Sequence, residues 1–64
     1  MDTDTITFTV SETALGYEVT TKHLKFADKW KFRKVSKLQL FDLMLGLTQK
    51  FNNEYHMAVL FEVD

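Results

Sequence analysis

The segment that follows Ser36 carries more apolar residues than one face of a helix can bury, and this excess constrains the fold most. Successive helical residues are turned by roughly 100°, which places one apolar stripe toward the core: Leu40, Leu43, Met44, Leu47 and Phe51. A second apolar stripe borders Asp42 and consists of Leu38, Phe41 and Leu45. An apolar surface rimmed by a carboxylate is typical of a site that binds a partner.

The sequence also marks the ends of this helix. Ser36 is a favoured N-cap residue, and Gln39 stands three residues later, as in a capping box. We expect the helix to run to about Asn52, because Asn52 and Asn53 tolerate the left-handed conformation common just past a helix end. Gly46 in the interior costs roughly 1 kcal/mol relative to alanine. This cost predicts that another group packs closely against Gly46.

The rest of the chain alternates as strands do. Residues 5–10 place Ile6, Phe8 and Val10 between threonines, which predicts a half-buried first strand. Alternation resumes at residues 17–21 and continues on the opposite parity through Leu24 and Phe26, so a bulge or break is expected near residue 22.

Two further strands are expected in the second half of the chain. A turn at Ala27-Asp28 followed by alternation over residues 29–35 predicts a second hairpin. Residues 57–63 are apolar at nearly every position, which predicts a last strand in the middle of the sheet.

These elements predict a single compact α+β domain over residues 1–64, with a small antiparallel-rich sheet in the order β-β-β-α-β and one helix packed on one face. A domain of this size buries only about 60% of its unfolded-chain surface. With no cysteine, a partner subunit is the means of stabilisation left open. One helix also leaves the second sheet face and the second apolar stripe uncovered, so we expect a homodimer.

Composition narrows the function. The hydrophobic content of 45% is too high for a disordered chain. There is no run long enough for a membrane span and no secretory signal, which predicts a cytoplasmic protein without membrane contact. The two histidines, His23 and His56, lack companions for a metal site or a nucleophilic triad. We therefore expect neither an enzyme nor a metal or other cofactor.

The net charge of −1 hides a segregated distribution. Residues 1–21 hold four acids and no base, whereas residues 22–37 hold seven bases against Asp28. Within that basic segment, cations alternate with an aromatic ring in a pattern that could bind phosphates and stack on bases: Lys25, Lys29, Trp30, Lys31 and Arg33. The alternative is a hairpin whose rings face the core while its lysines are solvated. The near-zero net charge lacks the basic excess of typical DNA-binding domains.

From Tyr17 onward the chain resembles the small uracil-DNA glycosylase inhibitors of phi29-like Bacillus phages. That family opens a hairpin with Tyr-acid-Val-Thr, matched here by residues 17–20, Tyr-Glu-Val-Thr. Its helix carries Phe-Glu-Val-Leu-Tyr-Gly, matched by residues 41–46, Phe-Asp-Leu-Met-Leu-Gly. The chain departs from the family in four respects. Leu45 stands in place of Tyr, Asp42 is one methylene shorter than Glu, residues 1–16 would be an added strand, and the basic segment is unexpected in a mimic of DNA.

The resemblance implies a homodimer whose apolar socket captures the leucine with which the glycosylase probes the DNA minor groove, so that the DNA-binding site is occluded. Phe41 and Leu45 would line the socket, Leu38 would lie at its edge, and Asp42 would accept hydrogen bonds from the enzyme. We therefore expect an inhibitor of uracil-DNA glycosylase. Two alternatives stay open: a nucleic-acid-binding module that uses the basic segment 22–37, and another phage-type anti-defence factor with a different protein target.

Overall fold

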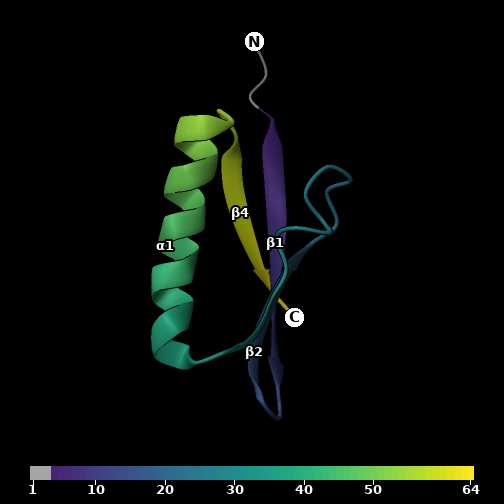
Figure 1. Ribbon diagram of the computed structural model, residues 1–64, viewed down its shortest axis with the longest axis vertical. Helices are drawn as coiled ribbons and strands as arrows, with labels where there is room; N and C mark the ends of the chain where they lie inside the picture. The colour runs from purple at the N-terminus through teal and green to yellow at the C-terminus, as the bar shows by residue number, and fades with distance from the viewer. Residues whose placement is uncertain (1–3) are drawn as a thin grey trace.

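In the computed structural model, which describes residues 4–64, a four-stranded sheet carries one helix on one face (Figure 1). The elements follow in the order β1 (Thr5–Thr13), β2 (Gly16–Thr21), β3 (Phe32–Val35), α1 (Lys37–Glu54) and β4 (Ala58–Val63). The predicted α+β class and element order are confirmed. Residues 1–3 of the predicted domain, Asp2 among them, lie outside the described range. No helix within that range is long and apolar enough to span a membrane.

The β1–β2 hairpin follows directly from its sequence. Ile6, Phe8 and Val10 are buried, as the alternation predicts, and Val10 pairs with Val19 of β2. Gly16 closes the turn with φ of 133°, a conformation that side chains rarely adopt. A Cβ atom at Gly16 would lie 2.9 Å from a backbone oxygen of β3. The turn therefore requires glycine for both conformation and space.

The sheet order is β3-β2-β1-β4, with β4 parallel to β1 and the other pairs antiparallel. The expectation that the last strand is central is wrong, because β4 lies at an edge of the sheet. Its apolar residues do not indicate burial on both faces. Phe61 stacks on Phe8 toward the helix, at 5.9 Å between ring centroids, whereas Leu60 is exposed. The threonines of β1 lie on the same face of the sheet as Leu60, the face away from the helix. Because these side chains are polar, that face can remain in contact with solvent.

The predicted second hairpin is only partly correct. β2 ends at Thr21, at the expected break, but residues 24–30 form turns instead of a strand. The Phe26 N–H donates to the His23 oxygen at 3.0 Å, and the Trp30 N–H donates to the Phe26 oxygen at 2.9 Å. These turns point the rings of Phe26 and Trp30 into the core, whereas Leu24 is 97% exposed. The regular spacing of aromatic residues in this segment therefore comes from turns whose rings pack on the core, and not from a strand.

The helix begins as predicted. The Ser36 hydroxyl accepts from the Gln39 N–H at 3.1 Å, and the Gln39 side chain accepts from the Ser36 N–H at 3.2 Å. Its end differs from the expectation, because the helix continues to Glu54 and the left-handed residue is His56, with φ of 53°. The ring of Tyr55 lies 5.1 Å from Phe51 and so holds the last turn in place.

One aromatic ring organises the core. Phe51 is fully buried and lies between rings from β1, from the 22–31 loop and from Tyr55, the C-cap residue of its helix. Its ring centroid is 5.6 Å from that of Phe8, and 5.1 Å from those of Phe26 and Trp30. Edge-to-face pairs of this kind contribute about 0.5–1.5 kcal/mol each beyond the apolar area they bury.

We predict that Phe51→Ala lowers the free energy of unfolding by about 3–5 kcal/mol, whereas Phe41→Ala changes it by less than about 0.5 kcal/mol. The first change opens a cavity between three segments, and the second removes an exposed ring from the same helix. Urea denaturation followed by circular dichroism compares the two variants with the parent chain. Equal destabilisation by both changes would contradict this description of the core.

Candidate functional site

The inward stripe of α1 supplies the core as predicted. Leu40, Leu47 and Phe51 are buried, and Leu43 and Met44 are partly buried against the same cluster. The helix therefore uses its whole inward stripe on its own chain. The second stripe of α1 does not pack in the core of the single chain.

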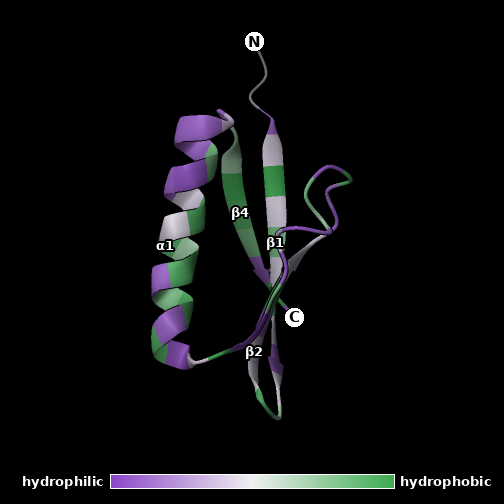
Figure 2. Cartoon of the chain, viewed as in Figure 1, coloured by the Kyte–Doolittle hydropathy of each residue, from purple (hydrophilic) through white to green (hydrophobic). Residues whose placement is uncertain are grey.

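That second stripe is exposed in the structure. Leu38 is 83% exposed, Phe41 65% and Leu45 60%, and hydrophobic residues lie on both sides of the N-terminal half of α1 (Figure 2). We call Leu38, Phe41, Asp42 and Leu45 the helix ledge. Their spacing puts them on one side of the helix, and Asp42 is also exposed. The structure thus brings together all four residues that the sequence singled out.

Gly46 lies next to the ledge and does not have the close neighbour that its sequence position predicted. A Cβ atom built on Gly46 meets no heavy atom within 4 Å among the described residues. The prediction of close packing is wrong for the isolated chain, because Gly46 faces solvent. The side of α1 that carries the ledge is therefore accessible down to its backbone at this point.

The charged residues of α1 are Lys37 and Asp42 in its N-terminal half and Lys50 and Glu54 in its C-terminal half. Asp42 is the carboxylate on the ledge. Near the C-terminal end, Lys50 and Glu54 form an ion pair one turn apart. The Glu54 hydrogen bond raises the pKa of Lys50 above its ordinary value. The ledge therefore combines three large apolar side chains with a carboxylate that can accept hydrogen bonds from a basic partner.

In the basic segment the aromatic rings face the core and the cationic side chains face solvent. This is the arrangement expected if the segment does not stack on nucleic-acid bases. The side chains of Lys25, Lys29, Lys31 and Arg33 are exposed, and the Arg33 Nε lies 3.8 Å from a Glu18 oxygen. This surface can attract phosphates by charge.

Trp30 is not free to stack on a base. Its ring packs edge-on against Phe51 and is partly buried. The Lys50 Nζ lies 5.7 Å from its centroid. Both neighbours come from α1, so the indole serves to fasten the loop to the helix.

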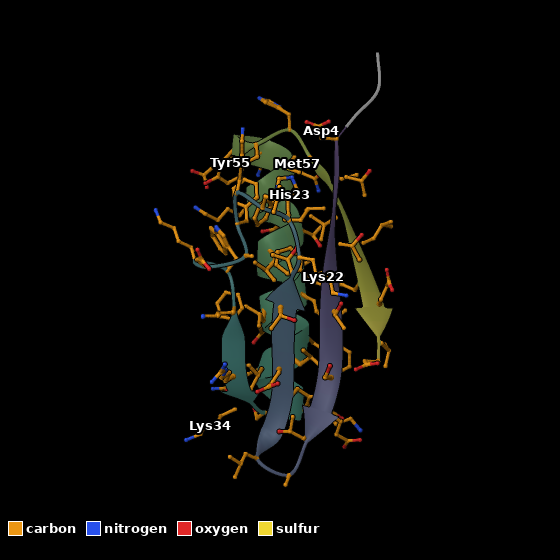
Figure 3. All side chains as sticks on the ribbon, turned by 90° about the vertical axis from the view of Figure 1, so that its right-hand side faces the viewer. Asp4, Lys22, His23, Lys34, Tyr55 and Met57 are labelled. Carbon is orange, nitrogen blue, oxygen red and sulfur yellow. The ribbon has the colours of Figure 1, made fainter. Side chains whose placement is uncertain are left out.

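The fold also forms a hollow of about 280 Å³ that the sequence did not indicate (Figure 3). It is lined by the residue before β1, by the 22–31 loop and by the connection between α1 and β4: Asp4, His23, Lys25, Phe26, Tyr55 and Met57. The His23 Nδ1 accepts from the Lys25 N–H at 3.3 Å. Residues so far apart in the chain give no local pattern that predicts the hollow. Within residues 4–64, no three His, Cys, Asp or Glu side chains are grouped to hold a metal ion.

Comparisons with models of protein families, with curated proteins and with solved structures found no match. The resemblance to phage glycosylase inhibitors therefore rests on the motifs at residues 17–20 and 41–46.

We predict that Gly46→Ala raises the free energy of unfolding by about 1 kcal/mol. An exposed helix interior favours alanine over glycine by this amount, and the added methyl group meets no neighbour. Thermal and urea unfolding of the variant measure the change. A less stable variant would show that the backbone at this position is restrained by something other than helix geometry.

Proposed function

We propose that this chain is a non-enzymatic protein-binding domain that inhibits uracil-DNA glycosylase by occluding the enzyme's DNA-binding site. The observation that carries the proposal is the helix ledge, in which Leu38, Phe41 and Leu45 are exposed around Asp42. Large exposed apolar side chains on a small domain mark interaction surfaces. A ring flanked by leucines is also the kind of anchor that concentrates binding energy.

The chemistry of the proposed target supports this choice. A base-flipping enzyme binds the DNA backbone through a positive channel and acts on a nucleotide extruded from the stack. The apolar ledge suits the leucine that such an enzyme inserts into DNA, and Asp42 suits a donor that otherwise binds phosphate. The same positions, 41, 42 and 45, are those that match the contact residues of the inhibitor family.

The 22–31 loop, which carries part of the basic segment that is unexpected in a mimic of DNA, is fastened to the other end of the helix, whereas Lys37 of that segment begins α1 beside the ledge. The Phe26 ring packs against Tyr55 at 5.0 Å, whereas the ledge occupies residues 38–45. Cations of the 22–31 loop are therefore separated along α1 from the proposed contact surface. Repulsion between this loop and a basic enzyme is correspondingly reduced.

We predict that the protein blocks release of uracil from DNA by uracil-DNA glycosylase, and that Phe41→Ala weakens inhibition at least about thirtyfold. Loss of an anchor side chain typically costs 2 kcal/mol or more, which corresponds to that factor. Inhibition is measured by titrating folded protein into a uracil-release assay. Leu24→Ala is the matched control, because Leu24 is more exposed than Phe41 and lies outside the ledge.

Asp42→Asn should act more mildly, mainly by slowing association at low salt. Full uracil release in a large molar excess of folded parent protein would rule out this target. Binding to a different protein that is lost in Phe41→Ala would then favour the other anti-defence role.

A nucleic-acid-binding function is the second candidate, because the exposed lysines of residues 25–31 favour contact with phosphates. Since Trp30 is packed on the helix, we predict only non-specific affinity, with a Kd of about 10⁻⁴ to 10⁻⁶ M that weakens steeply as salt rises. Fluorescence anisotropy with labelled single-stranded DNA measures it. Sub-micromolar binding at physiological salt, abolished by the double change Lys31→Glu and Arg33→Glu, would support the second candidate over the first.

A further inference from the structure

The two edges of the sheet differ in how they resist the addition of another strand. β3 has four residues, its register with β2 shifts between Tyr17 and Val19, and its exposed residues Arg33 and Lys34 are cationic. Lys34 also has φ of 57°, which interrupts the extended backbone. Short length, irregular register and positive charge are the features by which proteins keep edge strands from pairing.

β4 lacks these protective features. Its six residues keep one unbroken register with β1, from Ala58 opposite Thr5 to Val63 opposite Val10. Glu62 is its one charged residue. Leu60 is 56% exposed and Val63 is also largely exposed. In Figure 3 this strand forms the margin of the sheet beyond β1.

The backbone of β4 presents a regular row of hydrogen-bonding groups at this margin. The N–H groups of Ala58 and Asp64 both donate toward β1, at 2.9 Å. Backbone groups alternate in direction along a strand, so those of Val59, Phe61 and Val63 point away from β1. Among the strands of residues 4–64, none pairs with that side of β4. Three donors and three acceptors therefore stand ready for another strand.

We propose that β4 pairs antiparallel with β4 of a second copy of this chain, centred on Leu60, so that the two sheets join into one. The pairing is independent of the proposed target enzyme. It would satisfy the outward groups of Val59 and Phe61 by mutual hydrogen bonds. The two Leu60 side chains would meet on the face away from the helices.

The charge on β4 restricts the register. In a pair of β4 strands related by a twofold axis perpendicular to the sheet, even-numbered residues lie opposite even-numbered residues and odd opposite odd. This follows because directly opposite side chains point to the same face of the sheet. Pairing centred on Glu62 would set two carboxylates directly opposite each other, which is unfavourable. Pairing centred on Leu60 sets Glu62 opposite Ala58 of the second copy. That register separates the like charges and buries the exposed Leu60 against itself.

Crosslinking through a single introduced cysteine tests this register, because the chain has no cysteine of its own. Residues at the twofold axis in a non-hydrogen-bonded pair have Cα atoms about 4.5 Å apart, within the range of about 4.4–6.8 Å that a disulfide spans. Leu60→Cys should give nearly complete disulfide-linked dimer under mild oxidation at micromolar protein. Leu24→Cys, a more exposed position, should stay mostly monomeric. Equal crosslinking of the two variants would overturn the proposal.

Sedimentation equilibrium tests the same pairing without a covalent bond. The parent chain should have twice the 7.5 kDa mass of one chain, Leu60→Lys should be monomeric, and Leu24→Lys should remain dimeric. Phe41→Ala should also remain dimeric, even where it loses inhibition, so failure of the target and failure of the dimer are distinguishable. A monomeric parent chain would overturn the proposal. So would a dimer that survives Leu60→Lys and is lost in Phe41→Ala, since that dimer would form through the helix ledge.

Discussion

The packing of rings around Phe51 is the interaction on which the other features of this fold depend. Phe8 reaches it from the sheet, whereas Phe26 and Trp30 reach it from a loop that has no strand pairing of its own. Tyr55 packs on it from the position directly after the helix. Because these contacts hold the loop and the C-terminal turn of α1, the rings that look available in the sequence are committed to the core. The lysines between them remain in solvent.

This concentration of the core on one side of α1 explains how the opposite side can remain apolar. The helix is fixed by its inward stripe and by the capping box at Ser36 and Gln39, so Leu38, Phe41 and Leu45 add little to the stability of the isolated chain. A small domain with a thin stability margin nevertheless exposes them. Substitutions at these three positions can therefore alter the binding of a partner without unfolding the domain.

The sequence predicted those elements whose signals are local. Alternation at residues 5–10, the cap at Ser36 and the two stripes of α1 each depend on neighbours within a few positions, and all three are present. The aromatic pattern of residues 22–31 fits a hairpin equally well, because Phe26 and Trp30 can face a core from turns as well as from a strand. The apolar residues of β4 do not distinguish a buried strand from an edge strand, so they do not reveal its position in the sheet. The hollow beside His23 joins residues from three distant segments, so no pattern in the sequence could indicate it.

The parallel pairing of β1 with β4 has a consequence for the order in which the fold can assemble. The strands that it joins are far apart in the chain, as the Ser11 to Asp64 hydrogen bond illustrates with its separation of 53 residues. A β1–β2 hairpin can form early, but one side of β1 must wait for residues 58–63 to be synthesised. Closing so long a segment costs chain entropy before any contact compensates for it. Until that strand is in place, the backbone groups on the outer edge of β1 have no partner, and an unpaired strand edge makes a folding chain vulnerable to aggregation.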